Sequence, residues 1–311
     1  MPDFDFDVIV IGAGATGLIA AKHVAQRGYS TASCEAFCFG GLITNVNELN
    51  PPLPGAYLSG VELASNLMTE IAELGVENMN ETVTGLARNG ASLTVSTDAG
   101  TYGARAVIVA SGAKMKLTGV PGEAQFLHRG VAQCADCDGP LYHGEDVAVV
   151  GGGDSALQEA LVLARYCKHV HLVHRGSRFR AHRDLIEAIA ACDNVHIRWH
   201  TIVTELRGGE GLEMVCTRDV RNGATLELPC RGFFAYIGLQ PNSELAPAEI
   251  DRDADGFLHT DAALQTAMKG VYAAGAVRAG FGGLLSDASA DGERAAASVA
   301  ARLSSPMEVA G

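Results

Sequence analysis

Two stretches of the chain share one pattern: a short apolar run, a glycine-rich turn and then helical spacing of apolar residues. The three parts fall at residues 7–11, 12–17 and 18–27, and again at residues 146–150, 151–156 and 157–165. A short apolar run that ends in glycines predicts a buried strand, and the residues after the glycines predict a helix with one apolar face. Each stretch therefore predicts a strand that turns directly into a helix.

Further apolar runs predict more strands and one alanine-rich helix. The strands are expected at residues 30–34, 92–97, 104–110, 170–173, 195–206, 213–218, 225–228 and 270–275, and the helix at 286–302. The last strand and the helix have no nucleotide loop of their own, so they are expected to complete the first domain. The prediction is an α/β protein with two Rossmann-like nucleotide-binding domains of the three-layer ββα kind. The second (residues 115–247) is inserted into the first (1–114 and 248–311).

Composition and charge narrow the class of protein. A length of 311 residues suits two domains, and a net charge of -13 argues against a nucleic-acid surface. The first residues are acidic where a signal peptide would be basic, and the apolar stretch 8–21 is too short to span a bilayer. Eight cysteines with one close pair do not form a disulfide scaffold, so a cytoplasmic protein without a membrane span is expected.

The first glycine turn predicts a dinucleotide site. Gly12, Gly14 and Gly17 let the backbone turn tightly and approach a pyrophosphate at the start of the helix. Glu35 ends the next strand, about where an acid that binds a ribose hydroxyl is expected. The first domain is therefore interpreted as binding a dinucleotide with a free ribose, most simply FAD.

A basic cluster rather than an acid follows the second turn. Its members, His174, Arg175, Arg178 and Arg180, come after the strand at 170–173. An acid would repel a 2′-phosphate there, whereas guanidinium groups pair with it in a bidentate way, so the cluster predicts NADPH. The alternative is that these arginines only cap and solvate the end of a strand.

Between the two turns lies a pair of cysteines suited to redox chemistry. Cys134 and Cys137 are separated by two residues and can close a short disulfide, and Asp138 follows them. The same spacing is half of a zinc site, but no second ligand pair matches it, so no metal is predicted. Asp138 can exchange a proton with the pair if burial raises its pKa. The alternative is that it caps a helix.

In order and spacing, these motifs resemble those of the low-molecular-weight thioredoxin reductases, a branch of the flavin-dependent pyridine nucleotide-disulfide oxidoreductases. The resemblance covers nearly the whole chain. It rests on residues 12–17, 40–41, 110–113, 134–139, 151–156, 174–175, 179–180, 236–242 and 270–275.

The resemblance implies a relay in which electrons pass from NADPH to FAD, to the Cys134–Cys137 disulfide, and on to a thioredoxin-like protein or a small disulfide. It implies that Cys137 is nearer the flavin, that Cys134 attacks the substrate and that Asp138 is the acid/base. It also implies a homodimer, and domains that swing about hinges near 114–117 and 238–242.

The resemblance also assigns the cofactor sites. For FAD it implies Gly12, Gly14, Ala15, Thr16, Gly17, Glu35, Gly40, Gly41, Asn45, Ser111, Gly112, Gly275, Ala276 and Asp287. For NADPH it implies Gly151, Gly153, Asp154, Ser155, Ala156, His174, Arg175, Arg178 and Arg180.

The chain departs from the family pattern at three places. Ala276 stands where the family has an aspartate that binds the flavin, and Asp287 is the expected replacement. Gly283 and Leu284 stand where the family has an Arg-Gln pair near the flavin ring. The usual double arginine has become Arg175 and a glycine, with Arg178 expected to compensate.

These departures keep a second function open. It is a dithiol oxidase that passes electrons from a small dithiol through FAD to oxygen. Asp138 and the arginine cluster favour the reductase, whereas the altered flavin segment favours the oxidase. A protein that only senses nucleotides would need a silent cysteine pair, which the intact motif disfavours.

Overall fold

The computed structural model describes residues 4–46, 49, 59–90 and 92–304. The chain forms two units, one of residues 1–114 and 240–311 and the other of residues 115–239. Sequence reasoning placed the second boundary after residue 247 instead. The structure assigns 240–247 to the first unit because the Asn242 N–H donates to the Gly112 carbonyl at 3.0 Å and Ala246 is buried in that unit's core.

The first unit is built on a seven-stranded sheet in the order β3-β2-β1-β6-β5-β4, with β17 also paired to β6. Its strands are β1 (Phe6–Ile11), β2 (Thr31–Cys34), β3 (Glu77–Met79), β4 (Val83–Asn89), β5 (Ser92–Thr97), β6 (Thr101–Val109) and β17 (Val271–Ala273). Strands β1, β2, β3, β6 and β17 pair in parallel, whereas β4, β5 and β6 form an antiparallel meander.

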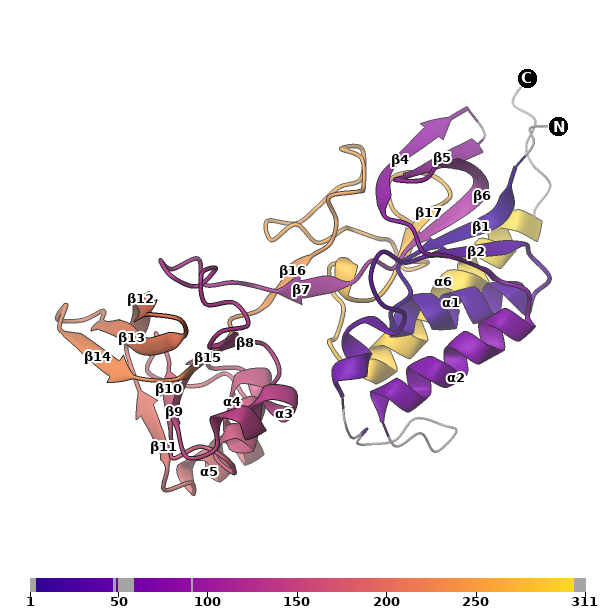
Figure 1. Ribbon diagram of the computed structural model, residues 1–311. Coiled ribbons are helices and arrows are strands. Elements are labelled where there is room, and N and C mark those ends of the chain that lie inside the picture. Colours follow the sequence, from indigo (N-terminus) through magenta and orange to yellow (C-terminus); the bar gives the residue numbers. More distant parts are fainter. Residues whose placement is uncertain (1–3, 47–48, 50–58, 91, 305–311) are drawn as a thin grey trace. The chain divides into compact units, whose positions relative to one another are not determined.

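Helices cover one face of this sheet. They are α1 (Ala15–Ala25), α2 (Gly60–Glu73) and α6 (Leu285–Ser304), and two 3₁₀ turns, η1 (Gly41–Asn45) and η3 (Gly275–Val277), flank them. Although α6 lies far from α1 and α2 in sequence, the three helices lie together in Figure 1. Alternate residues of β1 face opposite sides because successive side chains of a strand alternate. Val8 and Val10 pack under the helices, and Ile9 and Ile11 under the meander, which gives three layers.

The second unit repeats this three-layer plan. Its strands are β8 (Val131–Ala132), β9 (Asp146–Gly151), β10 (His169–Val173), β11 (Val195–Arg198), β12 (Thr201–Gly208), β13 (Leu212–Asp219), β14 (Thr225–Pro229) and β15 (Gly232–Tyr236). Its helical segments are α3 (Ala135–Asp138), η2 (Gly139–Tyr142), α4 (Asp154–Leu163) and α5 (Arg183–Ala190). The parallel sheet β11-β10-β9-β15-β8 packs its Val147 and Val149 under the helices and its Ala148 under the antiparallel sheet β12-β13-β14.

The expectation of one strand over residues 195–206 was wrong. The chain breaks into β11 and β12 at His200, whose φ of 53° lies in the left-handed region. The His200 N–H donates to the Gly176 carbonyl at 3.1 Å, which holds the turn in place. Strand β11 therefore belongs to the parallel sheet and β12 to the antiparallel one.

Two short strands connect the units. Strand β7 (Ala113–Met115) and strand β16 (Leu239–Pro241) pair with each other as a two-stranded sheet. The two crossings of the chain, after Lys114 and before Gln240, therefore lie side by side.

Candidate functional site

The turn between β1 and α1 packs closely because two of its residues lack side chains. Gly12 has a φ of 98°, and a Cβ there would lie 2.5 Å from the Ala110 carbonyl oxygen. A Cβ on Gly17 would lie 1.9 Å from the Gly12 carbonyl oxygen. Glycine is therefore required at both positions, and the strand turns directly into α1, the arrangement in which a helix N-terminus binds a pyrophosphate.

Two segments that are distant in sequence lie around this turn. Together with it they form what we call the glycine cradle, which consists of Gly12, Gly14, Gly17, Gly40, Gly41 and Gly275. The Gly40 N–H donates to the Ala13 carbonyl at 2.7 Å, which places Gly40 and Gly41 beside Gly14. A Cβ on Gly275 would lie 2.5 Å from the Thr16 hydroxyl oxygen. The structure thus brings residues from three of the FAD motifs around the start of α1.

Glu35 also lies at the cradle. Its Oε2 accepts the Ala13 N–H at 2.9 Å, and its Oε1 accepts the Phe37 N–H at 3.0 Å. The carboxylate is therefore held beside the turn, where a ribose-binding acid belongs. Because the cradle excludes side chains and carries this acid, its residues fit FAD.

The remaining predicted FAD residues belong to the same unit: Ser111 and Gly112 lie in a loop, Asn45 in η1, Ala276 in η3 and Asp287 in the first turn of α6. The Ser111 hydroxyl donates to the Asn242 carbonyl at 2.6 Å, and the Asn242 amide donates to the Ser111 carbonyl at 2.9 Å. Gly112 is held by the same asparagine, whereas Asn45 is exposed at the end of η1. The structure ties 111–112 to the segment that follows β16.

A cavity of about 620 Å³ opens at the carboxyl ends of β9 and β10 in the second unit. Ligands of parallel α/β sheets bind at this end. The predicted NADPH residues that line it are Gly151, Gly153, Asp154, Ser155, Ala156, His174, Arg175 and Arg180. Arg178 is not among the lining residues, so the structure gives it no place beside the cavity.

His174 organises the basic side of this cavity. Its Nδ1 lies 2.9 Å from the Gly151 carbonyl oxygen and its Nε2 lies 3.0 Å from the Arg178 carbonyl oxygen. The backbone of Arg178 thus supports the histidine, while Arg175 and Arg180 supply the guanidinium groups at the cavity. Two guanidinium groups beside a glycine turn fit the 2′-phosphate of NADPH.

The cysteine pair forms a disulfide at the start of α3. Cys134 and Cys137 have Cα atoms 5.3 Å apart, and the Cys137 N–H donates to the Cys134 sulfur at 3.2 Å. Cys137 is exposed and Cys134 is partly exposed. An N–H donor at a sulfur stabilises the thiolate once the disulfide is reduced, so this geometry suits thiol–disulfide exchange.

Asp138 ends α3 and precedes η2. It makes no side-chain capping bond to η2, and Cys134 rather than an acid caps α3. Burial and then the charge of Asp138 raise the pKa of Tyr142, so the carboxylate lies near that phenol. Asp138 thus directly follows Cys137 in the chain without capping η2.

A family model described as pyridine nucleotide-disulphide oxidoreductase matches residues 6–301. The chain belongs to this family.

Thioredoxin reductases stand out among the similar members of the family. The chain is 36% identical over 293 residues to thioredoxin reductase of Treponema pallidum, across 94% of this chain and 95% of that one. It is 35% identical over 276 residues to thioredoxin reductase of Streptomyces coelicolor, across 87% and 85%. The crystal structure of Lactococcus lactis thioredoxin reductase in its FR conformation superposes with a TM-score of 0.88, at 31% identity, over 95% of this chain and 98% of that one.

These similarities place this oxidoreductase in the low-molecular-weight thioredoxin reductase branch. The protein is therefore a thioredoxin reductase-like flavoprotein and an NADPH-dependent disulfide reductase. Its cofactors are FAD and NADPH, in agreement with the glycine cradle and the basic cavity.

The segment where this oxidoreductase departs from the family pattern contains an acid that sequence reasoning did not single out. Asp291 is buried on α6, accepts the Gly275 N–H at 2.9 Å and pairs with the Arg278 guanidinium at 2.6 and 2.8 Å. Asp287, the expected replacement for the acid missing at Ala276, lies in the first turn of α6 and accepts the N–H of Leu284, just before the helix, at 3.0 Å. Asp291 thus holds the Gly275 turn against the cradle.

Two further side chains lie near the disulfide, and sequence reasoning gave neither of them a role there. Glu159 on α4 accepts the Ala135 N–H at 2.8 Å, and the Tyr236 hydroxyl lies 3.0 Å from the same carboxylate oxygen. Burial raises the pKa of Glu159, although these two hydrogen bonds oppose the shift. Only the fold brings the three residues together, so the sequence alone could not show the contact.

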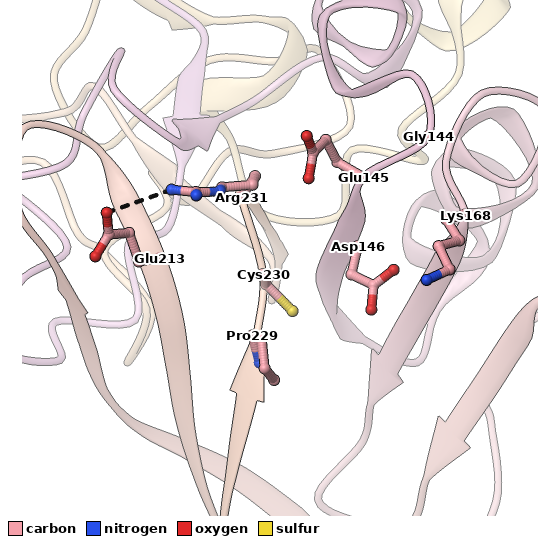
Figure 2. Close-up of a pocket in the computed structure, with 8 residues that line it drawn as sticks. All are labelled: Gly144, Glu145, Asp146, Lys168, Glu213, Pro229, Cys230 and Arg231. Atoms are coloured by element: carbon pink, nitrogen blue, oxygen red, sulfur yellow. Dashed lines mark hydrogen bonds and ion pairs between the residues drawn. The ribbon is translucent and has the colours of Figure 1, made fainter.

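A second cavity, of about 470 Å³, lies at the amino ends of β9 and β15 (Figure 2). Its walls carry mixed charges, including an ion pair of 3.4 Å between Arg231 and Glu213. Burial raises the pKa of the Cys230 thiol to about 12, so the sulfur stays protonated and unreactive. This end of a parallel sheet is opposite to the one that binds nucleotides in the family.

The described part of the chain was also considered for metal ligands and for membrane-spanning helices, and it offers neither. No group of three or more histidine, cysteine, aspartate or glutamate side chains there is arranged to hold a metal ion. None of the helices within those residues has the length and apolar character to cross a bilayer.

Proposed function

We propose that the protein reduces the disulfide of a thioredoxin-like protein, using Cys134, Cys137 and Asp138. The observation that carries the proposal is the Cys134–Cys137 disulfide at the surface of the unit that also holds the basic nucleotide cavity. The names of the similar proteins support thioredoxin as the partner.

In this proposal the two cysteines divide the exchange reaction. The Cys134 thiolate attacks the substrate disulfide and forms a mixed disulfide, and one substrate sulfur leaves as a thiol. The Cys137 thiolate then attacks Cys134, which releases the second substrate thiol and restores the Cys134–Cys137 disulfide. Asp138 holds the proton that each leaving sulfur takes up. Bound NADPH and FAD supply the two electrons that reduce the disulfide again.

The residues assigned to the cofactors are part of the same proposal. Gly12, Gly17, Gly275 and Glu35 would hold the pyrophosphate and ribose of FAD, and Arg175 and Arg180 the 2′-phosphate of NADPH. The arginines at the cavity disfavour the alternative of a dithiol oxidase, which has no need of a 2′-phosphate site.

An anaerobic titration of the purified protein with NADPH tests the proposal. Bleaching of the flavin with two new free thiols per chain, followed by reduction of added thioredoxin, is the expected result. A flavin that ignores NADPH but is bleached by a small dithiol would contradict it and favour the oxidase.

We further propose a cytoplasmic homodimer, as the resemblance to the reductase branch implies. Light scattering during size-exclusion chromatography measures the mass in solution, and twice the chain mass of 32.3 kDa is expected. Fractionation of the source cells tests the location.

A further inference from the structure

The backbone on both sides of Cys134 is held by side chains that the exchange reaction does not use. The Ala135 N–H, after the cysteine, donates to Glu159 Oε2 at 2.8 Å. The Tyr236 hydroxyl lies 3.3 Å from the carbonyl oxygen of Gln133, which precedes the cysteine. The same hydroxyl lies 3.0 Å from Glu159 Oε2, so its single hydrogen is shared between the carboxylate and the Gln133 carbonyl and links the two.

These contacts fix the two peptide planes that meet at Cys134. One plane contains the Gln133 carbonyl and the other contains the Ala135 N–H. With both held, the φ of −135° and ψ of 110° at Cys134 are set, and so is the direction of its side chain. This backbone places the Cys134 sulfur 3.2 Å from the Cys137 N–H.

Glu159 and Tyr236 are both held in place by regular secondary structure. Glu159 projects from α4 and Tyr236 ends β15, so both belong to regular elements of the unit that carries the disulfide. Tyr236 is only 8% exposed, and burial raises the pKa of its phenol. Tyr236 also lines the nucleotide cavity, which ties that wall of the cavity to the cysteine loop.

We propose that Glu159 and Tyr236 are positioning residues for Cys134: they orient it so that the Cys137 N–H stabilises its thiolate during attack on the substrate. The proposal rests on the proposed function for the role of Cys134 as the attacking thiol. It assigns the effect to hydrogen bonding and not to the charge of Glu159.

The test measures the reactivity of Cys134 directly. In a full-length Cys137→Ser background, iodoacetamide alkylation of the Cys134 peptide is followed by mass spectrometry between pH 5 and 10. Adding Glu159→Ala should slow alkylation at pH 7 by about tenfold and move the pH profile upward, the size of one lost hydrogen bond to a charged group. Tyr236→Phe keeps the buried ring and should slow it by about threefold, because one neutral hydrogen bond is lost.

Two matched variants separate positioning from charge and from general disturbance. Glu159→Gln keeps an oxygen that can accept from both the Ala135 N–H and the Tyr236 hydroxyl, so its rate should stay within about twofold of the parent. Gln158→Ala changes an exposed neighbour on the same helix and should behave likewise. Asp136 and Asp138 are present in every variant, so their charges do not affect the comparison.

Several outcomes would overturn the inference. One is an unchanged pH profile in Glu159→Ala, and another is a Glu159→Gln protein as slow as Glu159→Ala, which would point to charge. If Glu159→Ala does not fold, the test rests on Tyr236→Phe. A pH profile of Cys134 alkylation in Tyr236→Phe that equals the profile of the parent would then refute the positioning role. Alkylation of Cys134 needs no partner protein. A protein that fails to reduce thioredoxin would therefore contradict the proposed function, but the alkylation rates would still test the positioning role.

Discussion

Two aspartates, Asp136 and Asp138, lie on either side of Cys137, and substitution can test the role of each one separately. Asp138 follows Cys137 at the end of α3 and is partly exposed, whereas Asp136 precedes Cys137 and is exposed. Replacing Asp138 by Asn should lower kcat for disulfide reduction by about 10²-fold, because the leaving sulfurs lose their proton donor. Steady-state rates with thioredoxin check this.

The control for this prediction is Asp136→Asn, which removes a charge of the same sign from the same short helix. Flavin bleaching by NADPH should be unchanged in both variants, because that step precedes the exchange. Equal losses of kcat in the two variants would show that Asp138 acts only through its charge.

The arginines beside the nucleotide cavity give a second prediction at this scale. Arg175→Ala should raise the KM for NADPH by about tenfold or more and leave that for NADH unchanged, because only NADPH carries the phosphate that the guanidinium binds. Arg178→Ala is the matched control, since that side chain does not line the cavity. A large effect of Arg178→Ala on KM would instead support its expected compensating role.

Residues that act over long sequence separations are the ones that the sequence does not reveal. The glycine turns and the cysteine pair are contiguous, so their spacing alone predicts their chemistry. Asp291 accepts a hydrogen bond from the Gly275 N–H, which belongs to another element. Glu159 accepts one from the Ala135 N–H, 24 positions away in the sequence. No local pattern distinguishes such acids from others on the face of a helix.

At the scale of elements, the strand–turn–helix units were predictable because glycine is required by close backbone approach. Gly17→Ala should destabilise the protein by about 2 kcal/mol or more and reduce the flavin retained on purification, because the new methyl group would overlap the Gly12 carbonyl. Thermal unfolding and the ratio of flavin to protein absorbance measure the two effects.

Gly85→Ala provides the control for that prediction. Nothing lies within 4 Å of a Cβ built on Gly85, in β4 of the same unit. Its unfolding temperature and flavin content should stay close to those of the parent. A Gly17→Ala protein that matched Gly85→Ala would refute the need for close packing at the cradle.

Other elements were harder to predict, for different reasons. Helix α2 is absent from the predicted elements although Leu63, Leu67 and Ile71 recur at four-residue spacing and are buried, so its signal was available. The break between β11 and β12 was not available, because His200 is held in the left-handed region by Gly176, a residue from a distant loop.

For the whole molecule, a buried histidine makes stability depend on pH. His171 lies under the antiparallel sheet of the second unit near Arg198, Asp146, His196 and His169. Burial, with Arg198 next, lowers its pKa from 6.5 to about 4. Between these values the unfolded chain binds more protons, so the free energy of unfolding should fall as the pH drops from 6.5 to about 4.

Denaturant unfolding at several pH values tests this dependence. His171→Asn removes the titrating ring and should flatten the slope between pH 6.5 and 4, whereas His143→Gln, at an exposed position in the same unit, should not. A slope unchanged by His171→Asn would assign the acid sensitivity to other groups.

The inserted arrangement also divides the sites of the protein between its two units. The nucleotide cavity and the cysteine pair belong to the same unit, so their separation is set by packing and stays constant however the units move. The glycine cradle lies entirely in the other unit. The insertion therefore keeps the nucleotide cavity and the disulfide together on one folded unit and the glycine cradle on the other, so a protein cut down to the insert would keep the first two and lose the cradle.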